Sequence, residues 1–289
     1  MKAFLKNIGL FFLLLIGINV ILYVLIEHIY IKDYYKVDLN QKEYLLADSH
    51  GYHVGDLNET SGIYNLSQKG DSYEDLKRKL IFLIRNSEIE RLYLSVDDHT
   101  LSPSREDSNN KELSVYFSQH QDFESYGSYI NEKYLKRYVV YFNSKYSSIL
   151  KHFFKNKLAS MFSSAQEPVA WSKLSKEQKN TLSNERFNTY FTQKNQSKKL
   201  LSSLNTIIDL CKKNNVELIG VKFPLTSSYN NVLGKNSFKA DSLFNEKKLH
   251  VLDFKEAFLK QDSLFIDQDH LNTAGEKAFK KLLLKYQNR

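Results

Sequence analysis

The sequence predicts an α/β domain with a parallel sheet, carried on a single membrane-spanning helix. Two observations predict this arrangement: an uncharged stretch lies near the amino terminus, and short apolar runs alternate with helical stretches from residue 44 onward. Hydrophobic residues make up 42% of the 289 residues and charged residues 26%, which are values close to those of globular proteins. This composition excludes an intrinsically disordered chain and a protein with many membrane spans.

The uncharged stretch extends from Ile8 to Ile26, and its one strongly polar side chain is Asn19. About 20 apolar residues are needed to cross a hydrocarbon core of roughly 30 Å. A cleaved signal peptide is the alternative, but its apolar region is shorter and ends at a small-residue cleavage site, which the following EHIYIKDYYK lacks. We therefore expect an uncleaved membrane anchor.

The charges that flank the anchor predict its orientation. Lys2 and Lys6 precede the apolar stretch and Glu27 follows it, so the positive-inside rule places the amino terminus in the cytoplasm. We expect the main domain to lie outside the cytoplasm, in the periplasm or at the cell surface. The expected parts are a cytoplasmic tip and anchor (residues 1–27), a linker (residues 28–43) and the α/β domain (residues 44–289).

Charge and cysteine content exclude several classes of function. The formal net charge of +8 is spread along the chain and forms no dense basic run, which argues against a nucleic-acid partner and indicates a general affinity for anionic surfaces. Cys211 is the single cysteine, so the chain has neither an intrachain disulfide nor a thiolate metal cluster. We expect no cofactor.

Five compact apolar runs have the length and composition of buried strands. They are Tyr44–Ala47, Ile63–Leu66, Leu92–Val96, Val216–Val221 and Leu249–Leu252. A helix is expected to begin after Ser72, where a capping box precedes an apolar face that includes Leu76 and Leu80. The last helix is expected to begin with a second capping box, from Thr273 to Glu276.

A segment of about residues 102–213 separates the third run from the fourth and is too long for a bare loop, so we expect it to be an insertion with helices of its own. Its Lys151 and Lys155 alternate with Phe153 and Phe154 in a basic amphipathic pattern. Two interpretations stay open. The rings either stack on sugars or lie at a membrane surface, or they form the core of a helical lid, which is the interpretation we favour.

Residues that could form an activated serine nucleophile follow the first and last apolar runs. Ser49 follows the first run, and Asp267 and His270 follow the last; the carboxyl ends of parallel strands meet at one edge of a sheet, where ligands bind. A serine hydroxyl needs an imidazole base, and that base needs a carboxylate to orient it. Asp269 is the alternative to Asp267 as the orienting carboxylate.

The order of three sequence blocks resembles the SGNH hydrolase superfamily, also called the GDSL-like esterases and acyltransferases. Ala47-Asp-Ser49 is similar to its nucleophile block with Ala in place of Gly, Asn65-Leu-Ser-Gln-Lys-Gly70 to its second block, and Asp267-Gln-Asp-His270 to its last block. The resemblance covers residues 44–96 and 216–289. It implies a flavodoxin-like, three-layer parallel sheet, catalysis by Ser49, His270 and Asp267, and an oxyanion hole that includes the N–H groups of Ser49 and Gly70.

The third block departs from the family pattern. The family has an asparagine that donates to the oxyanion, whereas this chain has Asp97, followed by Asp98 and His99. An ionised carboxylate cannot donate a hydrogen bond and would repel an oxyanion. Either a protonated Asp97 or His99 then acts as the third donor, or activity is weak or absent.

Further side chains near these blocks are candidates for substrate binding. His50 and His53 follow the nucleophile, Asp98 follows the third strand, and Pro224 follows the fourth. A metal site built from His50, His53, His99 and Asp97 is conceivable, because imidazole and carboxylate groups bind zinc, but the chain has no compact ligand motif. We therefore expect no metal.

The expected function is that of a membrane-anchored serine esterase or O-acyltransferase. The resemblance implies acyl esters of a cell-surface polysaccharide, such as alginate or teichoic acid, as substrate class, and a membrane-bound O-acyltransferase as partner. Two alternatives stay open: a catalytically degenerate binding or scaffold subunit of a surface-polymer assembly, favoured by Ala47 and Asp97, and a lipid or peptide esterase that lies on the membrane through the insertion.

Overall fold

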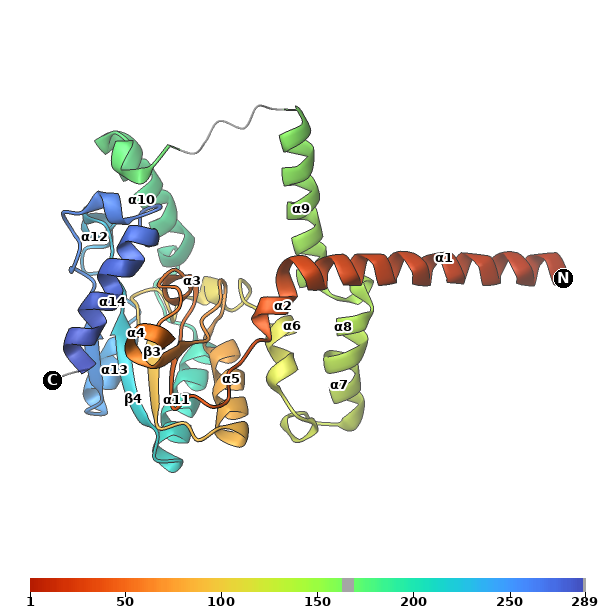
Figure 1. The fold of residues 1–289 in the computed structure, drawn as a ribbon, viewed down its shortest axis with the longest axis horizontal. Helices are drawn as coiled ribbons and strands as arrows, with labels where there is room; N and C mark the ends of the chain where they lie inside the picture. Colours follow the sequence, from red (N-terminus) through yellow and green to blue (C-terminus); the bar gives the residue numbers. More distant parts are fainter. Residues whose placement is uncertain (163–168, 288–289) are drawn as a thin grey trace. The chain divides into compact units, whose positions relative to one another are not determined.

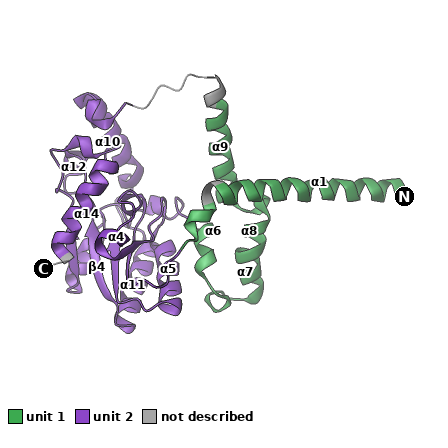
Figure 2. Ribbon diagram, in the orientation of Figure 1, with its two compact units in different colours: residues 1–36, 111–167 green, residues 37–110, 168–289 purple. Residues whose placement is uncertain are grey.

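The computed structural model describes residues 1–162 and 169–287 of the chain (Figure 1). They form two compact units, which are coloured separately in Figure 2. Unit 1 comprises residues 1–36 and 111–167, and unit 2 comprises residues 37–110 and 168–289. Both units thus contain part of the segment expected to be one insertion, while the boundaries expected at residues 27 and 43 stay predictions.

Unit 2 is built on a five-stranded parallel sheet. Its strands are β1 (Glu43–Leu46), β2 (Ile63–Asn65), β3 (Arg91–Ser95), β4 (Glu217–Lys222) and β5 (His250–Asp253). The spatial order is β2-β1-β3-β4-β5, and every neighbouring pair is parallel. This is the flavodoxin-like order, so the predicted fold class and all five predicted strands are confirmed. The order reverses between β1 and β3, which is where such sheets bind ligands.

Helices cover both faces of the sheet and produce three layers. On one face α5 (Tyr73–Asn86) packs beside α11 (Lys198–Lys213), over a core that includes Tyr44 and Leu46. On the other face α14 (Thr273–Gln287) packs over Leu45 and Ala47. Successive residues of β1 thus enter opposite cores, as the period of two along a strand requires.

The remaining helices of unit 2 are mostly short. They are α3 (Ser49–Tyr52), α4 (Asn58–Ser61), η2 (Pro103–Arg105), η7 (Trp171–Lys173), α10 (Lys176–Phe191), α12 (Ser227–Leu233), α13 (Ala240–Glu246) and η8 (Asp262–Leu264). The predicted insertion does contain helices, and α10 is one of them. It packs on α12, beyond the carboxyl end of β4.

The structure confirms both predicted helix starts and corrects the cap of the second. Ser72 caps α5 through a capping box with Asp75. The predicted box from Thr273 to Glu276 is wrong: the side chain of Asn272 accepts from the N–H groups of Ala274 and Gly275, so Asn272 caps α14. The asparagine one residue earlier thus accepts from the unpaired N–H groups of the first turn, and the Glu276 N–H donates to Asn272 O.

Unit 1 begins with α1 (Lys2–Ile26), which continues through η1 (Glu27–Ile31) and α2 (Lys32–Tyr34). Its later helices are α6 (Lys111–Ser114), η3 (Val115–Phe117), η4 (His120–Asp122), α7 (Tyr126–Ile130), η5 (Asn131–Leu135), α8 (Lys136–Tyr138), η6 (Val140–Phe142) and α9 (Ser144–Phe162). Stacked rings of Tyr35 and Tyr116, with the Arg137 guanidinium over both, join the two segments. By length and composition α1 is able to cross a membrane.

Candidate active site

Ser49, His270 and Asp267 form a continuous hydrogen-bonded chain at the carboxyl edge of the sheet. The Ser49 Oγ lies 2.9 Å from His270 Nε2, and His270 Nδ1 lies 2.8 Å from Asp267 Oδ2. Ser49 is the first residue of α3, immediately beyond β1, whereas His270 lies in the loop ahead of α14. The tertiary fold therefore brings together the three residues expected to form a nucleophile, base and carboxylate set, in the expected order.

The loop that holds the imidazole is closed by its own carboxylate. Asp267 Oδ1 accepts hydrogen bonds from the backbone N–H groups of Asp269 (3.1 Å) and His270 (2.9 Å). Asp267 thus fixes both the backbone at His270 and the ring nitrogen Nδ1. An imidazole held in this way keeps its proton on Nδ1 and presents a basic Nε2 to the serine.

Asp269 lies in a different environment from Asp267. One of its oxygens is 3.4 Å from His270 Nδ1, and the other is 3.4 Å from His50 Nε2. Its side chain is 2% exposed. Burial by itself would raise the pKa of Asp269, but the charges of His270, His50 and Arg186 lower that pKa below its usual value. The shorter distance from His270 Nδ1 therefore favours Asp267 as the orienting carboxylate. Asp269 instead links His270 to His50 and Arg186.

Arg186 is a residue of this site that the sequence did not reveal. It extends from α10, and its Nε lies 3.2 Å from Asp269 Oδ2 while its Nη2 lies 3.8 Å from Asp267 Oδ2. Burial opposes its charge, but Asp269 nevertheless raises the pKa of Arg186 above its usual value. No local motif marks this arginine, because both of its partners lie beyond β5 in the chain.

Two backbone N–H groups are available to stabilise an oxyanion. Within residues 1–162 and 169–287, the N–H groups of Ser49 and Gly70 donate to no acceptor. Gly70 has a φ of +88°, a conformation that other residues adopt only under strain. The Asn110 side chain donates to Lys69 O (2.9 Å) and Asp71 Oδ1 (2.7 Å), on either side of this glycine, and thereby fixes the turn.

Arg105 joins the loop of Ser49 to the loop of Gly70. Its Nη2 donates to Asp71 O and lies 3.2 Å from Asp48 Oδ2. Asp48 in turn caps α3 by accepting from the N–H of His50. Arg105 is 5% exposed, and burial opposes its charge, yet Asp48 raises the pKa of this arginine. A single buried guanidinium thus positions both candidate oxyanion donors.

Asp97, at the altered third block, is fully occupied by donors from its neighbours. Its Oδ1 accepts from the Phe223 N–H (2.8 Å), and its Oδ2 accepts from Ser95 Oγ (2.8 Å) and faces His50 Nδ1 (3.0 Å). The side chain is 5% exposed. These contacts require an acceptor, and an asparagine would turn its NH₂ group toward some of the same donors. The structure therefore places Asp97 in the packing beneath the site.

The other candidates lie at different depths. His99 Nε2 lies 2.9 Å from Asp48 Oδ2, and the His99 ring packs on Tyr190. Asp98 pairs with Lys222 and Lys255, both at 2.8 Å. Pro224 is buried just beyond β4. None of these three residues is exposed beside Ser49.

The two histidines that follow Ser49 differ sharply. His50 is 4% exposed, and burial would lower its pKa, but Asp97 and Asp269 raise that pKa well above its usual value. It is therefore a buried imidazolium beneath the triad. His53 is half-buried, with its ring 4.8 Å from that of His270, and burial lowers the pKa of His53 to about 4. Neutral His53 is thus the histidine that borders the accessible side of the site.

Two groups of side chains have ligand atoms close enough for a metal ion. One contains Asp48, His50 and His99, and the other contains His50, Asp269 and His270. Neither is the set of His50, His53, His99 and Asp97 that was weighed and set aside from the sequence. Each of these carboxylates already has a cationic or imidazole partner. Charge pairing therefore accounts for the clustering, and we assign no metal to it.

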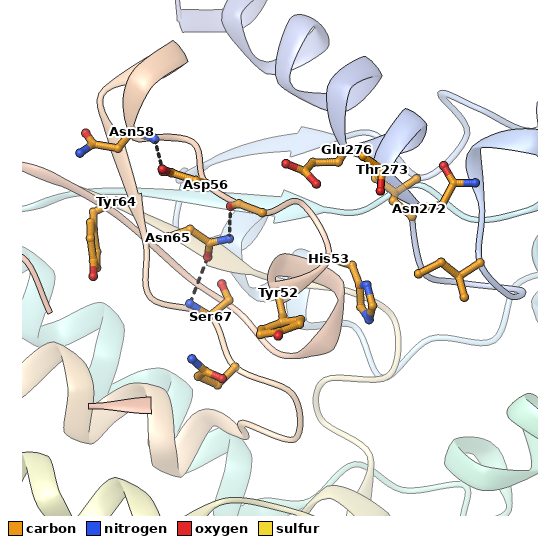
Figure 3. A pocket seen from close by; sticks show the side chains of 14 residues that line it. Tyr52, His53, Asp56, Asn58, Tyr64, Asn65, Ser67, Asn272, Thr273 and Glu276 are labelled. Atoms are coloured by element: carbon orange, nitrogen blue, oxygen red, sulfur yellow. Dashed lines mark hydrogen bonds between the residues drawn. The ribbon is translucent and has the colours of Figure 1, made fainter. Parts of the chain in front are cut away.

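A cavity of about 580 Å³ lies beside His53, whose ring contacts that of His270, although Ser49, His270 and Asp267 themselves do not line it (Figure 3). Tyr52 and His53, from the helix that begins with Ser49, border it on one side, and Asn272 and Glu276, just beyond His270, border it on the other. Its further lining residues are Gly55, Asp56, Asn58, Tyr64, Asn65, Ser67, Gln68, Ile266, Leu271 and Thr273. The lining is thus mainly amide, hydroxyl, carboxylate and aromatic groups.

Comparison with known proteins gives structural matches alone. No protein-family profile and no curated protein sequence matches the chain. Among solved structures, a Bacteroides fragilis protein assigned as an acylhydrolase is 8% identical (TM-score 0.42; 90% of this chain and 95% of that chain covered). A GDSL-like lipase from Bacteroides thetaiotaomicron is 7% identical (0.41; 89% and 94%), and a Streptococcus pneumoniae protein assigned as a platelet activating factor is 12% identical (0.39; 99% and 99%).

Proposed function

We propose that the protein is a membrane-anchored, extracytoplasmic serine esterase or O-acyltransferase. The observation that carries this proposal is the hydrogen-bonded chain Ser49–His270–Asp267, with contacts of 2.9 and 2.8 Å. This arrangement matches the geometry needed to activate a serine hydroxyl, and the two unpaired N–H groups supply an oxyanion site. A degenerate binding subunit would have no need for either feature.

In the proposed reaction Ser49 Oγ attacks the acyl carbonyl and its proton passes to His270 Nε2. Asp267 holds the Nδ1–H of His270 and stabilises the imidazolium that forms. The N–H groups of Ser49 and Gly70 donate hydrogen bonds to the carbonyl oxygen as it becomes negatively charged. Collapse of the intermediate breaks the ester C–O bond, and the leaving alcohol takes the proton from His270. Water or a sugar hydroxyl then accepts the acyl group from Ser49 by the reverse sequence.

We propose an acylated cell-surface polysaccharide as the substrate. The cavity beside His53 supports this class, because amide and hydroxyl groups of Asn58, Gln68 and Thr273 suit sugar hydroxyls, while Tyr52 presents a half-exposed ring. Location in the cell envelope is supported by α1, which is able to cross a membrane. A membrane-bound O-acyltransferase remains the proposed partner, on the basis of the sequence resemblance.

A fluorophosphonate probe tests the proposed nucleophile. We expect it to label the folded full-length protein and the Ser202→Ala variant, whose serine lies on the exposed face of α11. Labelling should disappear in Ser49→Ala. If the intact protein takes no label while its circular dichroism shows a folded state, the esterase proposal is wrong and the binding-subunit alternative holds.

A second experiment separates the acceptors. Short acyl-nitrophenyl esters are hydrolysed in the presence and absence of oligosaccharide, and the products are identified by mass spectrometry. Acylated oligosaccharide that forms with the wild type and not with Ser49→Ala supports transfer to a sugar. Turnover that produces free acid alone, at a rate that oligosaccharide does not change, supports the lipid or peptide esterase and contradicts the polysaccharide substrate.

A further inference from the structure

Asn19, the polar residue within the apolar helix α1, binds the backbone of a distant segment of unit 1. Its Nδ2 donates to Tyr138 O (2.8 Å), and its Oδ1 accepts from the Val140 N–H (2.9 Å). These backbone groups lie where α8 ends and η6 begins, because Val139 between them is extended (φ −101°, ψ 94°). The Tyr23 ring also packs on Tyr138, at 5.4 Å between centroids. Asn19 therefore satisfies the backbone groups that this break in the helix exposes.

The position of Asn19 along α1 indicates how deep in a bilayer the break between α8 and η6 would lie. Helical residues rise 1.5 Å each, so Asn19 lies roughly 10 Å before Ile26. The full stretch from Ile8 to Ile26 is needed to cross a hydrocarbon core of roughly 30 Å. If α1 spans the membrane, the chain at Tyr138–Val140 lies within one leaflet, where unpaired backbone groups cost several kcal/mol each. The amide of Asn19 removes that cost at both groups.

The same part of unit 1 exposes a set of large apolar side chains. Tyr141 is 47% exposed, Phe142 59%, Phe154 54% and Leu158 59%. Tyr141 and Phe142 belong to η6, whereas Phe154 and Leu158 lie on α9, where Lys151 and Lys155 each precede one of them by three residues. In Figure 1 the axis of α9 runs across that of α1, which it contacts. A helix that runs across a span and exposes Phe154 and Leu158 with lysines beside them suits the boundary between acyl chains and headgroups, where lysine side chains reach the polar region.

From these observations we infer that unit 1 is partly inserted in the lipid bilayer, in the leaflet that the carboxyl end of α1 reaches. The η6 turn lies beside Asn19 in the hydrocarbon, and α9 lies in the plane of the interface with its lysines at anionic headgroups. The inference rests on the proposed anchoring by α1. Tyr141 and Phe142 lie on η6, which packs on α1 beside Asn19, so their exposed side chains adjoin the apolar surface of α1. A surface shared with a membrane span selects a bilayer, and not a protein, as its occupant. The sequence alone favoured a lid for this segment.

Quenching by brominated lipid tests this inference on the full chain. One cysteine is added in each of the variants Phe142→Cys, Phe154→Cys and Leu158→Cys and is labelled with a nitrobenzoxadiazole dye. Each protein is then reconstituted in phosphatidylcholine and phosphatidylglycerol vesicles. Cys211 can stay, because it is 1% exposed and burial raises its pKa to about 12. Asn156, an exposed polar position on α9, is the matched control, and Ile16 reports whether α1 spans.

We expect lipids brominated in their acyl chains to quench the dye at Ile16, Phe142, Phe154 and Leu158 at least twofold more than at Asn156. Quenching at Ile16 with none beyond the Asn156 level at the other three positions would overturn the inference and leave the anchor intact. No quenching at Ile16 would overturn the anchoring itself, and with it the inference.

A variant of Asn19 provides an independent readout. Asn19→Leu leaves the α1 span apolar but removes the partners of Tyr138 O and Val140 N–H. We expect amide exchange at Val140 to accelerate about tenfold or more in vesicles, while Asn7→Leu, an exposed position of α1, changes nothing. Unchanged exchange at Val140 would show that Asn19 does not hold the break.

Discussion

At position 97 a single side chain decides whether a loop presents a donor or an acceptor to its surroundings. The family resemblance would place an asparagine there, and this chain has an aspartate. Its carboxylate accepts from Ser95 Oγ and the Phe223 N–H and pairs with the His50 imidazolium. An aspartate thus suits its donors at this position, among them the His50 ring nitrogen, a partner that no local pattern in the sequence identifies.

The two aspartates beside His270 should differ in what their removal does. We expect Asp267→Asn to lower kcat about 10³- to 10⁴-fold with little loss of thermal stability, because the amide no longer stabilises the imidazolium. Asp269→Asn should lower the melting temperature, because His50 and Arg186 lose a buried carboxylate. Ester hydrolysis and thermal unfolding of both variants test this. A larger loss of kcat in Asp269→Asn would reverse the two roles.

At the scale of elements, the site depends on two loops that follow adjacent strands. The loop after β1 carries Ser49, and the loop after β2 carries Gly70. Arg105 contacts Asp48 in the first loop and Asp71 O in the second. Lys79, which is fully buried on α5, contacts Leu66 O and Asp71 in that second loop. The distance between the loop after β1 and the loop after β2 is therefore set by Arg105 on η2 and Lys79 on α5, and not by the strands alone.

Arg105→Lys should therefore damage catalysis more than binding. One ammonium group cannot reproduce the fork that reaches both loops. We expect kcat to fall about 10- to 100-fold with KM changed less than about threefold, since misplacing one oxyanion donor weakens the transition state selectively. Arg91→Lys is the matched control: Arg91 also makes two ion pairs, with Glu43 and Glu217, but at the amino ends of the strands. An equal effect in both variants would contradict a positioning role for Arg105.

At the scale of the whole molecule, charges beneath the triad couple the site to the stability of the fold. His50 joins Asp97, beyond β3, to Asp269, beyond β5. Its pKa is raised in the folded protein, so its stabilising contribution is fully present below the unfolded-state pKa of about 6.5. The contribution is lost as the pH rises through the higher folded-state pKa.

This linkage predicts a pH-dependent effect of His50→Gln. At pH 6 we expect the variant to unfold with a free energy about 3 kcal/mol below that of the wild type, because two buried carboxylates lose their cation. The difference should shrink as the pH is raised through the folded-state pKa of His50, because the wild type then loses the same charge. Urea unfolding at several pH values measures it. His250→Gln, at an exposed position of β5, should show no such trend, and a gap that stays constant or widens would exclude a charged His50.

By itself the sequence predicted the sheet, the helix α5 and the three residues that the structure brings into one hydrogen-bonded chain. Compact apolar runs and a capping box are local patterns, and Ser49, Asp267 and His270 lie next to predicted strand ends, so their meeting followed from a parallel sheet. The start of α14 at Thr273 was also predicted, but its cap was not, because Asn272 and Thr273 are both able to cap a helix and local pattern did not choose between them.

Only the tertiary structure decided what surrounds those residues. Arg186 and Arg105 contact the site from segments that carry no motif. Asp97 and His50 pair with each other because the fold buries them side by side. The same holds for Asn19, whose amide binds a backbone break more than a hundred residues away in sequence. Hydrogen bonds and ion pairs depend on angstrom-scale separations, and residues distant in sequence acquire such separations only when the chain has packed.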